Sequence, residues 1–256
     1  HIAFVADWFG QMGKTYFYLF ILGSILLFFK TTKTIGVLKK RIMLTAPYAI
    51  FLTLFIFSKY SSNSKLNGDS TLSHVFFYGS IIGFAIFIFV SWYLVFPKGS
   101  GELRKKVKDM DKSLIFLIFW FTLVALAATT AIRFLFEFTP ITTVLASFCL
   151  VYIFDFFWLN KKQYIKWIGT LFIVLLLFAP SSYGLISKYY TISLNQANGS
   201  GPGYHLLWQQ AGKWTRENTQ ENAVFAHWWD YGYWVQSGFE RATITDGGNF
   251  IGWWNY

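Results

Sequence analysis

Charged residues are scarce in this chain. Only 13% of its 256 residues are Asp, Glu, Lys or Arg, whereas 55% are hydrophobic and 22% are aromatic. This composition excludes an ordinary soluble domain, in which about a quarter of the residues are charged. The sequence therefore predicts a membrane protein.

Cysteine is almost absent, because Cys149 is the single one and it lies in an apolar run. One cysteine can form neither an intrachain disulfide nor a cysteine-based metal cluster, and the histidines lack metal-ligand spacing. We therefore expect no cysteine- or histidine-based metal site in this sequence. The chain begins at His1 rather than Met and stops within a Gly- and aromatic-rich stretch, so we expect an internal fragment.

Six apolar segments have the length and composition of membrane helices. They cover residues 8–29, 42–57, 75–96, 113–132, 141–159 and 165–186. The second segment is short and contains Pro47, so we expect it to be kinked or extended at its ends.

Lys and Arg alternate between the loops of this six-span arrangement. The loops after the first, third and fifth segments hold most of them: Lys30, Lys33, Lys39, Lys40, Arg41, Lys98, Arg104, Lys105, Lys106, Lys108, Lys112, Lys161, Lys162 and Lys166. Short cytoplasmic loops retain Lys and Arg, so we expect a multi-pass protein whose residues after about Ser187 are extracytoplasmic. The net charge of +10 then reports membrane topology, and no nucleic-acid partner is expected.

The remaining chain reads as a linker followed by a soluble domain. We expect a transmembrane domain over residues 1–187, a linker over 188–203 that includes the turn-rich sequence NQANGSGPG, and a soluble domain from 204 to 256. Residues 223–227 and 242–245 are typical of strands, and residues 231–237 of a helix. This order predicts the start of an α/β domain.

The most distinctive motif is HWWDYG, residues 227–232, between the first expected strand and the helix. Two indole N–H donors and one carboxylate acceptor can bind both the oxygen and the proton of one hydroxyl group. A Ser or Thr side chain is the natural ligand. The alternative is that Trp228 and Trp229 pack in a core beside a helix-capping Asp230.

In this motif the sequence resembles the catalytic subunit of oligosaccharyltransferase, most closely its archaeal members. Trp228, Trp229, Asp230, Tyr231 and Gly232 match the family's WWDYG signature without a gap, and residues 243–249 (TITDGGN) add to the likeness. The resemblance implies that Trp228, Trp229 and Asp230 bind the Ser or Thr hydroxyl of an Asn-X-Ser/Thr acceptor. Tyr231 and Gly232 are expected to shape the turn.

A second likeness lies between the fourth and fifth apolar segments. There the sequence from Arg133 to Pro140, RFLFEFTP, resembles a family element of an arginine, an apolar stretch and a proline. The resemblance implies that Arg133 binds the phosphate of a lipid-linked donor, for which a guanidinium is well suited. The alternative is an Arg133–Glu137 ion pair that anchors the helix end.

The resemblance further implies the back half of a GT-C-type membrane domain. Its partners would be a lipid-linked oligosaccharide, an acceptor polypeptide and the membrane, with a monomeric catalytic subunit in the cell membrane if the source is archaeal. The catalytic carboxylates and the ligands of a Mn²⁺ or Mg²⁺ cofactor would precede His1, so this chain alone is expected to be inactive and to hold no catalytic residue.

Two other functions fit part of this pattern. Another membrane glycosyltransferase that uses a lipid-phosphate sugar would share the spans without needing WWDYG. A non-enzymatic transporter or export subunit would show paired Gly- or Pro-interrupted helices, and the sequence lacks such a pair.

Overall fold

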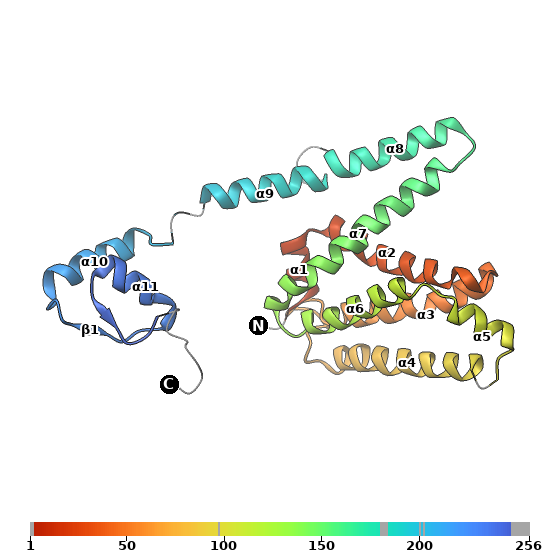
Figure 1. Cartoon of the computed structure of the whole chain (residues 1–256), viewed down its shortest axis with the longest axis horizontal. Helices are drawn as coiled ribbons and strands as arrows, with labels where there is room; N and C mark the ends of the chain where they lie inside the picture. Colours follow the sequence, from red (N-terminus) through yellow and green to blue (C-terminus); the bar gives the residue numbers. More distant parts are fainter. Residues whose placement is uncertain (1–2, 97, 180–183, 200, 202, 247–256) are drawn as a thin grey trace. The chain divides into compact units, whose positions relative to one another are not determined.

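The computed structural model describes residues 3–96, 98–179, 184–199, 201 and 203–246, and the chain forms two units (Figure 1). Unit 1 covers His1–Lys188 and unit 2 covers Tyr189–Tyr256. The division falls next to the expected end of the transmembrane domain at residue 187. Each unit has its own architecture.

Unit 1 is a bundle of helices. Among the described residues, four of them are long and apolar enough to cross a membrane, or five if α5 and α6 count as one bent span. The helices are α1 (Val5–Met12), α2 (Lys14–Thr31), α3 (Leu38–Phe57), α4 (Thr71–Val95), α5 (Gly101–Lys108), α6 (Lys112–Ala128), α7 (Leu135–Trp158) and α8 (Gln163–Phe178). Short 3₁₀ turns, η1 (Thr32–Ile35) and η2 (Ile132–Phe134), follow α2 and precede α7. This helical architecture agrees with the membrane domain expected from the sequence.

The first expected span, residues 8–29, is wrong as a single helix. Gly13 has a φ of 80°, which an L side chain rarely adopts, and it separates α1 from α2. The membrane-length element therefore starts at Lys14 and continues through η1 to Ile35.

The second span is longer than its apolar run. α3 begins at Leu38 and includes Lys39, Lys40 and Arg41 before the apolar part, so it reaches 20 residues with Pro47 inside. The expected extension at the ends is confirmed. Basic side chains at the end of a span keep their charges in the polar layer while the helix continues.

The fourth span is shorter than expected and is preceded by an unexpected helix. α6 ends at Ala128 rather than near residue 132, and α5 precedes it at a bend of 69°. Ser100 caps α5 by accepting a hydrogen bond from Leu103 N, and Asp111 caps α6 by accepting from Ser113 N. Two separate caps explain why one basic loop becomes a short helix and then a span.

The sixth span, expected over residues 165–186, is also wrong. α8 ends at Phe178, because Ala179 is extended (ψ 145°) and a residue before proline avoids the helical region. The 16 residues of α8 fall short of the other spans. A further helix, α9, covers Leu185–Gly199.

The turn-rich linker expected over residues 195–203 is wrong for Asn195–Gly199, which form the last turns of α9. Gln196 and Ala197 favour helix, and glycine is common where helices end. Residues 200 and 202 lie outside the described part.

Aromatic rings fill the core of unit 1. Trp8, Phe17, Phe20, Phe121 and Phe138 are fully buried, and the ring of Phe138 contacts those of Trp8, Phe20 and Phe121 at centroid distances of 5.2–5.6 Å. α2 and α7 approach closely at Gly23, where a Cβ atom would lie 2.0 Å from the Leu145 carbonyl oxygen. The two helices therefore pack backbone to backbone.

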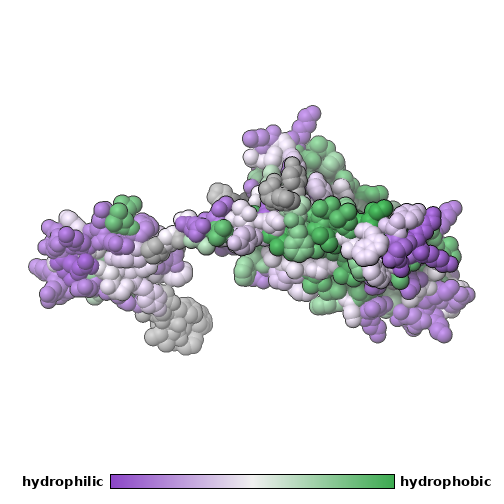
Figure 2. All heavy atoms as spheres, turned by 90° about the horizontal axis from the view of Figure 1, so that it is seen from above, coloured by the Kyte–Doolittle hydropathy of each residue, from purple (hydrophilic) through white to green (hydrophobic). Residues whose placement is uncertain are grey.

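Loops of unit 1 gather at its two ends. At one end the backbone N–H groups of Val5 and Ala6 donate to the carbonyls of Lys59 and Tyr60, and Lys59 Nζ donates to the Thr129 carbonyl at 3.2 Å. At the other end α5 contacts η1. Figure 2 shows hydrophobic side chains over the middle of unit 1 and hydrophilic ones at the end that carries α5.

Unit 2 is small and contains two short parallel strands. β1 (Val224–Phe225) and β2 (Ala242–Thr243) pair in parallel, and α10 (Leu206–Asn218) precedes them. Between the strands lie η3 (Trp229–Tyr231), α11 (Gly232–Trp234) and a π-helical stretch, η4 (Val235–Phe239). The order of strand, helix and strand expected from the sequence is present in these residues.

Candidate functional site in unit 2 and Arg133

The WWDYG motif forms a tight turn directly after β1. Trp228 is extended, with φ −65° and ψ 136°, and its carbonyl accepts a hydrogen bond from Tyr231 N at 3.0 Å. The same carbonyl accepts from Nδ1 of His227 at 2.8 Å. The turn therefore fixes the backbone of Trp228, Trp229 and Asp230 before the helix starts at Gly232.

The side chains of Trp228 and Trp229 are exposed, at 66% and 53%, and Asp230 is exposed as well. No other described residue forms a hydrogen bond with either indole N–H or with the Asp230 carboxylate. These two tryptophans therefore do not pack in a core of unit 2. Two donors and one acceptor remain available to a ligand.

Gly232 is the point where the chain after β2 crosses the motif. A Cβ atom on Gly232 would lie 2.4 Å from Cβ of Asp246 and 2.6 Å from the Thr245 carbonyl oxygen. The carboxyl ends of parallel strands meet at one edge of a sheet, so the segments following β1 and β2 necessarily meet there. Any side chain at residue 232 would separate them.

Gln236 forms hydrogen bonds with β2 and with the residue that crosses the motif. Its Nε2 donates to Thr243 Oγ1 at 3.0 Å and to Asp246 Oδ2 at 2.8 Å. Because Gln236 lies on the helix that follows the motif, these bonds connect the motif helix to β2 and the residues after it.

Aromatic rings pack the motif turn against α10. Tyr231 and Trp234 lie on Trp208 of α10 at centroid distances of 5.0 and 4.9 Å, and Phe239 lies 5.8 Å from the same ring. Tyr231 therefore anchors the turn through its ring, whereas the two tryptophans before it face solvent.

Arg241 fixes β2 to α10. Its guanidinium is buried and donates to the carbonyls of Arg216 and Thr219 at 3.1 and 2.9 Å, to Thr219 Oγ1 at 3.0 Å and to the Glu240 carbonyl at 2.9 Å. The last carbonyls of a helix have no partner within it and carry partial negative charge. A buried cation at this end satisfies them.

Arg133 lies in unit 1, on η2, just before α7. Both Arg133 and Glu137 are exposed, and no ion pair joins them among the described residues. The guanidinium likewise has no hydrogen bond to another described residue. Arg133 and the motif belong to different units, and each site is defined within its own unit.

Divalent metals need several carboxylate or imidazole ligands that converge. Within the described ranges no group of three or more His, Cys, Asp or Glu side chains is arranged to hold a metal ion. The described residues therefore do not fit Mn²⁺ or Mg²⁺.

Comparisons with known proteins point in one direction. No family model matches the chain. It is 33% identical over 84 residues to dolichyl-phosphooligosaccharide-protein glycotransferase 1 of Pyrococcus furiosus, covering 32% of this chain and 8% of that protein. It is 27% identical over 188 residues to the protein of the same name from Pyrococcus horikoshii, covering 68% and 18%.

A eukaryotic protein also matches. Identity is 26% over 184 residues to the STT3 subunit of dolichyl-diphosphooligosaccharide–protein glycosyltransferase of Saccharomyces cerevisiae, covering 64% of this chain and 25% of that subunit. The chain is therefore similar in sequence to these glycotransferases and to the STT3 subunit. It spans a quarter or less of the length of these relatives. The likeness supports a transferase at the level of the family.

Sequence reasoning missed three residues of the unit 2 site. Gln236, Arg241 and Asp246 received no role, although the order of strand, helix and strand places the residues after both strands at one edge. That order was the available signal for Asp246. Gly247 to Asn249, which carry the rest of the TITDGGN likeness, lie outside the described residues.

Proposed function

We propose that this chain is part of an oligosaccharyltransferase catalytic subunit, which transfers a glycan from a lipid-phosphate or lipid-pyrophosphate carrier to Asn in Asn-X-Ser/Thr. The observation that carries the proposal is the pair of exposed indole N–H groups beside the exposed Asp230 carboxylate, without partners among the described residues. The likeness to the Pyrococcus and yeast proteins supports the same reaction class.

In this proposal the motif binds the acceptor. The Asp230 carboxylate accepts a hydrogen bond from the Ser or Thr hydroxyl, and the indole N–H groups of Trp228 and Trp229 donate hydrogen bonds to the hydroxyl oxygen. A site built for a hydroxyl rejects a side chain that lacks one, because its own polar groups would stay unpaired. Gly232 and Tyr231 keep the backbone in place.

In the same proposal Arg133 binds the phosphate of the lipid-linked glycan donor. Its guanidinium has two parallel N–H groups that fit a phosphate, and it stabilises the charge that develops when the lipid phosphate leaves. The exposed position at the start of α7 and the lack of a described ion pair support this role. A Mn²⁺ or Mg²⁺ ion also belongs to the proposal and requires ligands beyond the described residues.

The topology completes the proposal. In this proposal the end of unit 1 that carries α5 faces the cytosol, since Lys and Arg gather there. The 16-residue α8 then crosses the membrane as a sixth, short span, so that α1, Arg133 and unit 2 belong to the extracytoplasmic side. Acceptor site and donor site then share one side of the membrane.

Acceptor binding by the full-length protein tests the motif. We expect a peptide with Asn-X-Thr to bind at least about tenfold more tightly than one with Asn-X-Ala, and Asp230→Ala to remove the difference. Glu221→Ala is the matched control, because Glu221 is an exposed carboxylate of unit 2 outside the motif. Equal binding of both peptides, unaltered by Asp230→Ala, would contradict the proposal and favour another membrane glycosyltransferase or an export subunit.

Tryptophan variants give a second arm. Trp228→Phe and Trp229→Phe keep a ring but remove the N–H donor, so we expect each to lower the affinity for the Asn-X-Thr peptide by roughly fivefold to tenfold. Trp214→Phe is the control, since Trp214 is exposed on α10 of the same unit. An equal loss in all three variants would show a general effect of surface tryptophans.

Arg133 is tested with a lipid phosphate in the full-length protein. Arg133→Lys keeps the charge but loses the planar pair of donors, so we expect weaker binding of the lipid phosphate, and a greater loss in Arg133→Ala. Glu137→Gln should leave binding unchanged or slightly tighter. Unchanged binding in Arg133→Ala would remove Arg133 from the donor site and leave the acceptor site unaffected.

A further inference from the structure

Helix α5 presents basic side chains on its exposed face. Arg104, Lys105 and Lys108 are exposed, whereas Leu103 and Val107, four residues apart, are half-buried. The helix bends by 69° from α6. A short basic helix at this angle to a membrane-crossing helix runs along the membrane surface rather than across it.

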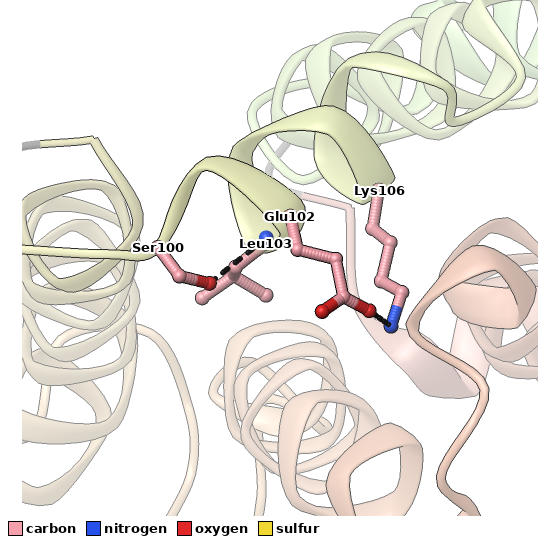
Figure 3. Close-up of polar contacts among 4 residues, drawn as sticks. All are labelled: Ser100, Glu102, Leu103 and Lys106. Atoms are coloured by element: carbon pink, nitrogen blue, oxygen red, sulfur yellow. Dashed lines mark hydrogen bonds and ion pairs between the residues drawn. The ribbon is translucent and has the colours of Figure 1, made fainter.

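A second group of cations belongs to η1 and the start of α3. Lys33, Lys39 and Lys40 are exposed, α5 contacts η1, and the charge of Lys40 acts on the Glu102 carboxylate of α5. Figure 3 shows the Glu102 and Lys106 side chains together on one side of α5. The two groups of cations therefore adjoin.

Few carboxylates oppose these cations. Glu102 is bound by Lys106, whose hydrogen bond and charge lower the pKa of that carboxyl, and Asp111 caps α6. Asp109 is exposed without an ion pair to another described residue. No described carboxylate forms an ion pair with any cation of the following set, which we name the basic surface: Lys33, Lys39, Lys40, Arg104, Lys105 and Lys108.

Nearby cations that lie on aromatic rings mark the level of the membrane surface. Lys98 lies 5.2 Å from the ring of Tyr93 at the end of α4, and Lys166 lies 5.6 Å from the ring of Trp158 at the turn between α7 and α8. Trp, Tyr and Lys gather where the hydrocarbon layer meets the headgroups. The basic surface is at this same end of unit 1.

We propose that the basic surface binds the headgroups of anionic phospholipids. Six adjoining cations, none of them in an ion pair with a described carboxylate, attract negative charge, and their place beside the ring-bound lysines puts phospholipid phosphates within their reach. Each Lys or Arg near an anionic membrane contributes roughly a fivefold gain in association. This binding does not depend on the reaction that the protein catalyses.

The test uses the full-length protein in phosphatidylcholine nanodiscs with a trace of spin-labelled lipid, either phosphatidylglycerol or phosphatidylcholine. Electron paramagnetic resonance gives the fraction of each lipid held at the protein. We expect a several-fold preference for phosphatidylglycerol that falls as salt rises. Equal association of the two lipids would overturn the proposal, and this arm needs no variant.

Variants locate the site. Lys39→Gln with Lys40→Gln, and separately Arg104→Gln with Lys105→Gln, should each lower the preference for phosphatidylglycerol by about fivefold, or remove it where it is smaller than that. The four changes together should abolish it. The control pair Lys65→Gln with Lys213→Gln removes two exposed cations elsewhere and should leave the preference unchanged. The same loss in the control pair would overturn the assignment.

A competition arm separates the lipid from free phosphate. Inorganic phosphate at the ionic strength of the chloride control should displace no more phosphatidylglycerol than chloride does. Displacement by millimolar phosphate would show a site for soluble phosphate and contradict the lipid proposal.

Discussion

Trp8 in unit 1 and Trp228 in unit 2 are the same residue type in opposite surroundings. Trp8 is 1% exposed and packs on Phe17 and Phe138, whereas Trp228 is 66% exposed on a turn. Unit 1 is held together by buried rings. Unit 2 also has a ring cluster around Trp208, but it depends in addition on a backbone crossing at Gly232 and on the polar bonds of Arg241 and Gln236. Exposure, rather than residue type, distinguishes an aromatic residue that can bind a ligand from one that fills a core.

The largest expected effect is the removal of a ring from the core of unit 1. Phe138→Ala should lower the free energy of unfolding by about 3–5 kcal/mol, because it leaves a cavity among Trp8, Phe20 and Phe121. Phe136→Ala is the control on the same helix, since Phe136 is 84% exposed, and should cost less than about 1 kcal/mol. Denaturant unfolding of the protein in micelles measures both. Equal losses would mean that the ring core does not stabilise unit 1.

The next effect concerns the polar core of unit 2. Arg241→Met should cost about 3 kcal/mol, because the carbonyls of Arg216 and Thr219 lose charged donors in a buried place. Hydrogen exchange at the amides of α10 and β2 would report the loss locally. Lys213→Met, on the exposed side of α10, should change the free energy of opening measured by hydrogen exchange by less than about 0.5 kcal/mol. Unchanged protection in Arg241→Met would show that unit 2 rests on its rings alone.

A smaller effect is expected at the crossing of the motif. Gly232→Ala should cost about 1–3 kcal/mol, since the new methyl group overlaps Asp246 and Thr245, and should weaken acceptor binding as the turn shifts. Gly203→Ala is the matched control, because a Cβ there meets Trp234 at an ordinary 3.4 Å. Stability by hydrogen exchange and peptide affinity should fall together in the first variant only.

The smallest effect belongs to exposed α5. Ser100→Ala should cost about 1 kcal/mol of helix stability through loss of the cap to Leu103 N. Glu102→Gln should cost less, because its ion pair with Lys106 is exposed. Since the folded pKa of Glu102 is lowered, first by the Lys106 hydrogen bond, its contribution is present above the ordinary Glu pKa and disappears as pH falls through the lowered one. Exchange protection of α5 that is independent of pH in this acidic range would contradict that ion pair.

The sequence predicted the elements whose signals are local. The apolar runs of α4 and α7, and the order β1, helix, β2, follow from hydropathy and from β-branched and aromatic patterns. Hydropathy alone misplaced the ends of spans, because the start of α3 is basic and Gly13 divides the first span. α5 had a signal in Ser100 and in Leu103 and Val107, but its charges masked it.

The site was predictable in part. Trp228, Trp229 and Asp230 stand out by residue type, and their exposure agrees with a binding role. Arg241 and Gln236 could not be found, since their roles depend on tertiary approach between α10, the motif helix and β2. The missing Arg133–Glu137 ion pair likewise depends on side-chain conformation rather than on spacing.

The bond from Lys59 to the Thr129 carbonyl has a mechanical consequence. Lys59 also receives the backbone of Val5 through its own carbonyl, and burial lowers the pKa of its ammonium group. The N-terminal helix, the loop after α3 and the turn that leads to Arg133 are thus coupled as one body. If Arg133 binds the donor as proposed, these hydrogen bonds connect the binding turn to the two other segments, so a displacement of Arg133 would be resisted by all three.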